Sequence, residues 1–271
     1  MDWMICASSL ILTVGGLTTL AVKWRVDVRY GLTGGAGIGL VTAVLMHGIV
    51  RIAGNIHWFV LIGMEGLTIL ILTAIVIAFR FYRDPERRPP ADDHLIVSPA
   101  DGEILYIRKL EDGEIPVSEK KGHAMSISEM TQTDILDHGA WHIGIEMSIL
   151  DVHVNRAPVE GKVVLQKHIP GLFLSLREWK APYANERVVS VFDNGHFRIG
   201  TVQIASRLVR RILSYQKEGA WVMQGDRIGM IKFGSQVDLI IPDLEDFRIQ
   251  VEQGDHVTAG TSVLCKYSET T

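Results

Sequence analysis

The Gly234–Ser235 pair is the part of this 271-residue sequence with the most direct route to covalent chemistry. A serine hydroxyl is a nucleophile that needs a base, and glycine offers an unhindered carbonyl and backbone angles closed to other residues. Attack of the hydroxyl on the Gly234 carbonyl would turn the amide into an ester. Loss of the Ser235 α-proton would then free Gly234 as a carboxyl terminus and leave a dehydroalanine, which hydrolyses to a pyruvoyl group and ammonia. In a chain with 26 glycines, however, an isolated Gly-Ser pair is more often a turn or a bulge in a hairpin.

Four other segments precede the Gly-Ser pair in a specific order. They are FYRDPER at 81–87, VSPADG at 97–102, DVHVNRAP at 151–158 and NER at 185–187. Together with the Gly-Ser pair they resemble the phosphatidylserine decarboxylases, in particular the short membrane-bound form, from Arg80 to the end of the chain. The resemblance implies a carboxy-lyase that converts the serine headgroup of a phospholipid, phosphatidylserine or archaetidylserine, to the ethanolamine lipid. It also implies a covalent pyruvoyl cofactor, made from Ser235 by self-cleavage into residues 1–234 and 235–271, which acts as an electron sink.

The resemblance assigns roles to individual side chains. It implies a relay of Asp101, His153 and Ser235, in which the carboxylate orients the imidazole and the imidazole takes the serine proton. His153 is also the implied proton donor for the decarboxylation. From the residues alone, the alternative interpretation of Asp101 is a turn residue, and that of His153 is a half-buried histidine of a strand.

One branch of the family has a second histidine three positions after the first, where this chain has Arg156. Either His153 then serves both steps, or another group such as His142 or His168 takes one of them. Arg156, His168 and Phe173 are the candidate substrate contacts.

Phe173 belongs to an apolar segment, residues 170–176, that begins with a Pro-Gly turn. The family has a similar loop beside the active site, although an ordinary strand fits these residues equally well. Glu186 and Arg187 are interpreted as an ion pair rather than as a substrate contact. The two cysteines, Cys6 and Cys265, have no spacing that indicates a disulfide framework or a metal site.

Short runs of alternating or β-branched residues, bounded by turn residues, predict the strands that must position these groups. They lie at 104–107, 162–165, 187–192, 198–204, 237–241 and 247–251. Residues 203–216 instead show apolar side chains at helical spacing, which predicts a basic amphipathic helix. The expected fold is α+β, with a β-rich catalytic domain containing barrel-sandwich-like hairpins, preceded by three transmembrane helices.

Two similar stretches, QGDRIG at 224–229 and QGDHVTAG at 253–260, predict turn-then-strand units. They also suggest an alternative function, a membrane-tethered binding module like the lipoyl and biotinyl carriers. A carrier needs a lysine at an exposed hairpin tip, and Lys232 is the only lysine between the two turns.

Three apolar stretches at 4–22, 32–50 and 58–78 are each close to the roughly 20 residues needed to span a bilayer. The sequence therefore predicts a membrane anchor at 1–79, a Pro-rich linker at 80–94 and a catalytic domain at 95–271. Basic residues lie in the first loop and after the third span, so the positive-inside rule places the catalytic domain on the cytoplasmic side.

The charge of the chain limits the choice of partners. The sequence has 31 acidic and 27 basic residues, with no basic stripe, which argues against nucleic acid. The expected partners are a phospholipid in the bilayer and the chain's own second fragment. A homodimer is left open.

Overall fold

The computed structural model describes residues 2–268 except 25, 55, 93, 111–113, 119–122, 134–138, 177, 179, 207–210 and 233–234. The chain forms two compact units. The first comprises Met1–Arg83 with Ser148–Leu150, and the second comprises Asp84–Met147 with Asp151–Thr271.

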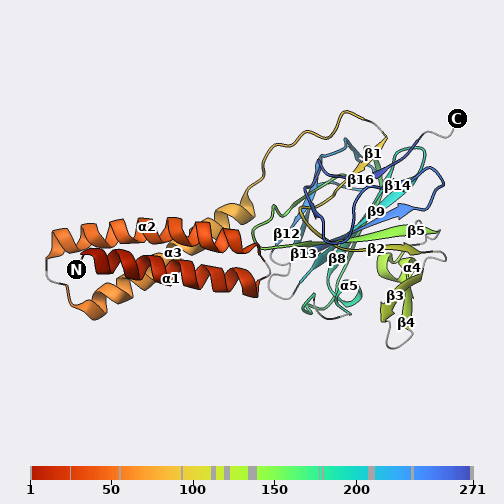
Figure 1. Cartoon of the computed structure of the whole chain (residues 1–271). Coiled ribbons are helices and arrows are strands. Elements are labelled where there is room, and N and C mark those ends of the chain that lie inside the picture. Colours follow the sequence, from red (N-terminus) through yellow and green to blue (C-terminus); the bar gives the residue numbers. More distant parts are fainter. Residues whose placement is uncertain are drawn as a thin grey trace. The chain divides into compact units, whose positions relative to one another are not determined.

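The first unit contains three long helices, α1 (Asp2–Lys23), α2 (Val28–Ala53) and α3 (Trp58–Tyr82) (Figure 1). Each is long and apolar enough to cross a membrane, and each contains one of the predicted spans. Helices α1 and α2 approach closely at Gly31, Gly35 and Gly39, where an added Cβ on Gly35 would lie 2.7 Å from the Cα of Val14. Small residues at every fourth position are what allow two helix backbones to pack this closely in a membrane.

One acidic side chain, Glu65 of α3, is buried within the first unit. The hydroxyls of Ser8 and Ser9 on α1 donate to its Oε1 at 2.9 and 2.5 Å. A carboxyl group at membrane depth is costly unless it has polar partners. These two hydrogen bonds therefore satisfy Glu65 and join α3 to α1.

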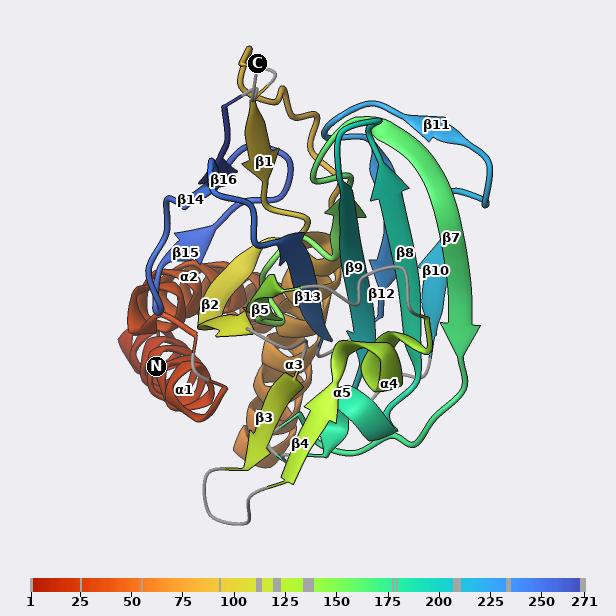
Figure 2. The same ribbon diagram turned by 90° about the vertical axis from the view of Figure 1, so that its right-hand side faces the viewer.

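The second unit is centred on an eight-stranded antiparallel sheet that curls into a half-barrel (Figure 2). The α+β prediction, with a β-rich domain and three apolar helices at the amino end, is confirmed. The strand order is β11 (Trp221–Val222), β7 (Gly161–Ile169), β8 (Arg187–Asp193), β9 (Arg198–Ala205), β13 (Ser235–Pro242), β5 (Ala140–Met147), β2 (Gly102–Leu110) and β15 (His256–Val257).

Smaller elements surround this sheet. One three-stranded sheet has the order β1 (Leu95–Val97), β16 (Val263–Lys266), β14 (Arg248–Ile249), and another the order β10 (Ile212–Ser214), β12 (Arg227–Ile231), β6 (Val154–Arg156). A hairpin of β3 (Glu114–Ser118) and β4 (His123–Ser126) and two short helices, α4 (Ile127–Thr131) and α5 (Ala181–Ala184), complete the unit. All six predicted strand segments overlap observed strands.

Both faces of the large sheet are buried in its centre. Side chains alternate along each strand, so Val237 and Leu239 of β13 enter one hydrophobic cluster and Ile240 enters the other. β13 thus lies between two cores, with β5 and β9 as its neighbours in the sheet.

The two similar stretches near the carboxyl end have the same local structure. Gly225 and Gly254 have positive φ values of 82° and 94°, which glycine adopts without strain. Asp226 and Asp255 each accept a hydrogen bond at 2.8 Å from the backbone N–H three residues earlier. The chain then enters β12 and β15, so the predicted turn-then-strand units are confirmed.

The predicted amphipathic helix over residues 203–216 is wrong wherever the structure describes that range. Residues up to Ala205 belong to β9, and Ile212–Ser214 form β10, while 207–210 lie outside the described residues. Ile204 pairs with β13 on one side and β8 on the other. Sheet pairing and burial of this side chain outweigh a helical spacing of four apolar residues.

Candidate active site

Ser235 is the first residue of β13, and its backbone pairs with Met147 of β5 and Ala205 of β9. The residue on the carboxyl side of the predicted cut is thus held in the middle of the large sheet. Its predicted cleavage partner, Gly234, lies outside the described residues.

His153 immediately precedes β6 and is fully buried. Its Nδ1 lies 2.9 Å from the backbone oxygen of Asp151, and its own carbonyl accepts the N–H of Ile231 at 3.3 Å. Ile231 and Ser235 are four residues apart, so their Cα atoms are separated by at most roughly 14 Å. The backbone of His153 is therefore hydrogen-bonded to the last residue of β12, the strand that precedes β13 in the chain.

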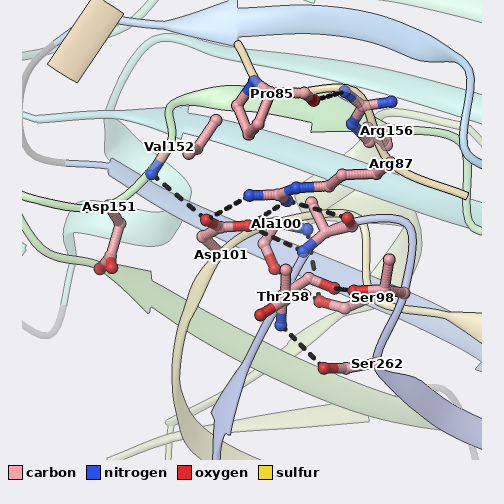
Figure 3. Close-up of polar contacts among 12 residues, drawn as sticks. Pro85, Arg87, Ser98, Ala100, Asp101, Asp151, Val152, Arg156, Thr258 and Ser262 are labelled. Carbon is pink, nitrogen blue, oxygen red and sulfur yellow. Dashed lines mark hydrogen bonds and ion pairs between the residues drawn. The ribbon is translucent and has the colours of Figure 1, made fainter. Parts of the chain in front are cut away.

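Asp101 is buried in the turn between β1 and β2, and both of its carboxylate oxygens contact the guanidinium of Arg87 (Figure 3). Its other hydrogen bonds come from the backbone N–H groups of Ala259, at 2.8 Å, and Val152, at 3.4 Å. Asp101 thus contacts the backbone beside His153, whereas the imidazole Nδ1 faces the carbonyl of Asp151.

The backbone of this turn requires a glycine at position 102. Its φ is 147°, and an added Cβ would lie 2.2 Å from the backbone oxygen of Glu146. Ser98 stabilises the same turn by donating its hydroxyl to the carbonyl of Ala100 at 2.6 Å. The turn interpretation of the VSPADG segment is therefore correct, and it is compatible with a functional Asp101.

Arg156, a candidate substrate contact, is almost completely buried. Its guanidinium donates to the backbone oxygens of Gly225 and Pro85 at 2.9 and 2.8 Å and to Oδ1 of Asp84 at 3.2 Å. Burial, followed by the charge of Arg227, lowers the pKa of Arg156 from its ordinary value. The arginine at the position of the second histidine thus holds residues that follow α3.

The segment with Phe173 is a loop with one isolated bridge, between Leu172 and Asn185. The side chain of Asn185 accepts the N–H of Leu174 at 2.7 Å and donates to the carbonyls of Leu174 and Ala205 at 2.9 and 2.8 Å. Ala205 is the partner of Ser235 in the sheet. Asn185 therefore ties this loop to the strand beside Ser235, a role that the sequence alone did not reveal.

The two residues after Asn185 have different partners from those predicted. Arg187 is buried and donates to the backbone oxygens of Met130, Tyr183 and Asn185. Glu186 accepts from Nε2 of His168 at 3.0 Å, and His168 itself is largely exposed. Glu186 and Arg187 therefore do not form an ion pair with each other, because Arg187 binds backbone carbonyls of α4 and around α5.

His142, the other alternative base, is fully buried on β5, with Nε2 2.8 Å from Oδ2 of Asp238. The hydroxyl of Tyr106 donates to the same oxygen at 3.0 Å, and the amide of Gln236 donates to Oδ1 at 2.7 Å. Burial and the charge of Asp238 raise the pKa of Tyr106 well above its ordinary value, so the phenol stays protonated and donates. His142 is thus engaged with a carboxylate of β13, the strand that begins at Ser235.

Comparison with known proteins identifies the family to which the chain belongs. A sequence model of the phosphatidylserine decarboxylase family matches residues 76–265. A provisionally named archaetidylserine decarboxylase proenzyme of Methanothermobacter thermautotrophicus is 39% identical over 208 residues, 77% of this chain and 88% of the relative. A phosphatidylserine decarboxylase proenzyme of Xanthobacter autotrophicus is 38% identical over 207 residues, 76% of this chain and 78% of the relative. The chain belongs to the phosphatidylserine decarboxylase family.

Proposed function

We propose that this protein decarboxylates the serine headgroup of a membrane phospholipid with a pyruvoyl group that it makes by cutting itself between Gly234 and Ser235. The observation that best supports the proposal is the link from His153 to β12, which leads within four residues to Ser235. It occurs in a chain whose relatives are named as proenzymes of phosphatidylserine or archaetidylserine decarboxylases.

For the cleavage, His153 is the proposed base that accepts the hydroxyl proton of Ser235 while the oxygen attacks the Gly234 carbonyl carbon. The peptide bond breaks, its nitrogen takes up a proton, and an ester joins the two residues. Removal of the Ser235 α-proton expels the Gly234 carboxylate, and hydrolysis of the remaining dehydroalanine releases ammonia. Asp101 contributes by fixing the N–H of Val152, and so the backbone that carries His153.

The strand pairing is compatible with a cut at this point. β13 pairs with β5 over its whole length and with β9 from Ser235 to Ile240, so residues 235–271 would remain in the sheet. The pyruvoyl group at position 235 would supply the electron sink for loss of carbon dioxide. His153 is the proposed acid that returns a proton to the headgroup carbon.

The loop held by Asn185 is the proposed substrate contact, with Phe173 as its aromatic residue, because the loop is tied to the residue paired with Ser235. Arg156 is less suited to this role because its guanidinium binds Asp84, Pro85 and Gly225. His168 has Glu186 as its partner.

We further propose that α1, α2 and α3 anchor the enzyme in a membrane with the second unit on the cytoplasmic side. All three helices have the length and hydropathy of membrane spans. Lys23 and Arg29 flank the first connection, Arg80 lies in the last turn of the third helix and Arg83 directly follows that helix. This is the charge distribution of a cytoplasmic face.

The mass of the purified protein tests the proposed function directly. Two chains, residues 1–234 and 235–271, are expected, with the shorter one blocked to Edman sequencing, and vesicles of phosphatidylserine or archaetidylserine should release carbon dioxide. A folded protein with a single full-length mass and no carbon dioxide release would contradict the proposal. The carrier alternative allows no self-cleavage, and its Lys232 is only partly exposed.

Removal of residues 1–79 is expected to leave self-cleavage intact but to lower turnover on bilayer substrate. The second unit has its own hydrophobic core, and the helices only raise the local concentration of lipid. Turnover of a short-chain, water-soluble analogue should therefore be much less affected than turnover of vesicles. Equal losses on both substrates would show that the helices are part of the active site or of the fold.

A further inference from the structure

The segment that follows α3, residues 84–90, is bound to the rest of the second unit by several ion pairs, and we call it the strap. We propose that Arg87 of the strap is a positioning residue, which holds Asp101 and, through Asp101, the backbone that carries His153. The proposal rests on the proposed function, because it concerns the efficiency of the same site.

Two arginines elsewhere in the second unit bind the strap. Arg156 binds Asp84 and the carbonyl of Pro85. Arg227 donates to Oδ2 of Asp84 at 2.5 Å and to Oε1 of Glu86 at 2.7 Å, and this last hydrogen bond lowers the pKa of Glu86 from its ordinary value. Without such contacts, the Pro-rich strap would have no interactions that select one position. The contacts therefore fix the position of Arg87.

Arg87 completes a junction of three chain segments at Asp101 (Figure 3). Its Nη1 and Nη2 contact the two carboxylate oxygens, and Nη1 also donates to the carbonyl of Ala259 at 2.9 Å. The same carboxylate accepts the N–H groups of Ala259 and Val152. The carboxylate of Asp101 therefore contacts the strap, the turn at residue 259 and the residue before His153.

Burial makes this ion pair consequential. The side chains of Arg87 and Asp101 are only 9% and 7% exposed. Loss of one member of a buried pair leaves an uncompensated charge, which moves or takes up water. Either response would release the N–H of Val152 and so loosen the backbone that carries His153.

The neighbouring Arg88 provides a matched control. It has the same side chain and lies in the same strap, but it is exposed and makes no hydrogen bond or ion pair with the described residues. A change that acts only through net charge or through contact with lipid headgroups would affect both arginines alike.

The test compares Arg87→Gln with Arg88→Gln in the full-length chain, by following self-cleavage after synthesis and decarboxylation by the cleaved fraction. We expect Arg87→Gln to slow cleavage by about tenfold or more and Arg88→Gln to cleave like the unmodified chain. Millimolar guanidinium should restore part of the rate of Arg87→Gln but none in Ser235→Ala. If Arg87→Gln does not fold, Arg87→Lys, which lacks the two-pronged contact, should be slower than Arg88→Lys.

A double variant separates positioning from a general effect on stability. If Arg87 acts through Asp101, adding Arg87→Gln to Asp101→Asn should change the cleavage rate by less than about twofold. The proposal would be overturned if the two substitutions had multiplicative effects on the cleavage rate of the double variant. It would also be overturned if Arg87→Gln cleaved as fast as the unmodified chain. Failure of the unmodified chain to cleave would instead contradict the proposed function, so the two failures are distinguishable.

Discussion

Replacement of Ser235 by alanine is expected to leave one full-length chain with no decarboxylase activity. Alanine has no hydroxyl to attack the preceding carbonyl and no oxygen substituent to eliminate, so neither the cut nor the ketone can form. Intact mass and carbon dioxide release from serine-phospholipid vesicles measure the two outcomes separately. The loss should be complete rather than partial, because the variant lacks the precursor of the reactive group itself.

A second serine of the same sheet serves as the control for Ser235→Ala. Ser190 is buried on β8, so Ser190→Ala removes a hydroxyl from another strand of the sheet but should still yield two chains. A Ser235→Ala protein that is cut at the same bond would show that another nucleophile makes the cut.

Replacement of His153 by alanine is expected to have the second largest effect and to separate the two tasks assigned to this residue. Loss of a positioned acid or base costs about 10² to 10⁴ in rate. Maturation has hours to reach completion, whereas turnover is measured over seconds. If His153 serves both steps, the variant should cleave late or not at all, and any cleaved fraction should decarboxylate poorly.

The other outcomes for His153→Ala are equally informative. Normal cleavage with low turnover would restrict His153 to the proton-donor role, and His142, bound to Asp238, would become the next base to test. The exposed His196, in a turn between β8 and β9, is the control, because His196→Ala should change neither step. Normal cleavage and normal turnover in His153→Ala would show that His153 is only a structural residue.

The strands and spans could be predicted from the sequence because each depends on a local pattern. Alternation in residues 237–241 predicted β13, and uninterrupted apolar runs predicted α1 to α3. The helix predicted over residues 203–216 is wrong because four apolar residues at helical spacing also fit two short strands, and the sheet neighbours decide between them. Those neighbours, β8 and β13, are not visible in the local sequence.

The partners of the site residues were harder to predict because they come from distant parts of the chain. Asp101 and His153 lie in motifs that resemble those of the family, but nothing in the local sequence indicates that Arg87 contacts Asp101. Arg156 marked a departure from one family branch, yet its bond to Pro85 depends on the path of the strap. In the sequence Asn185 is only one residue of a motif, and its hydrogen bond to Ala205 depends on the folded loop.

The position of β13 in the large sheet determines whether the protein could refold after a cut before Ser235. Residues 235–271 provide β13, β14, β15 and β16. Of these, β13 pairs with β5 and β9, β15 with β2 and β16 with β1 from the rest of the chain, whereas β14 pairs with β16. Folding of the uncut chain is a first-order process that does not depend on concentration. After a cut before Ser235, refolding would require two separate molecules to meet, so it would become second order and would compete with aggregation of exposed strands. Activation would thus convert a reversible folding equilibrium into kinetic stability, in which the lifetime of the mature enzyme is set by its rate of unfolding.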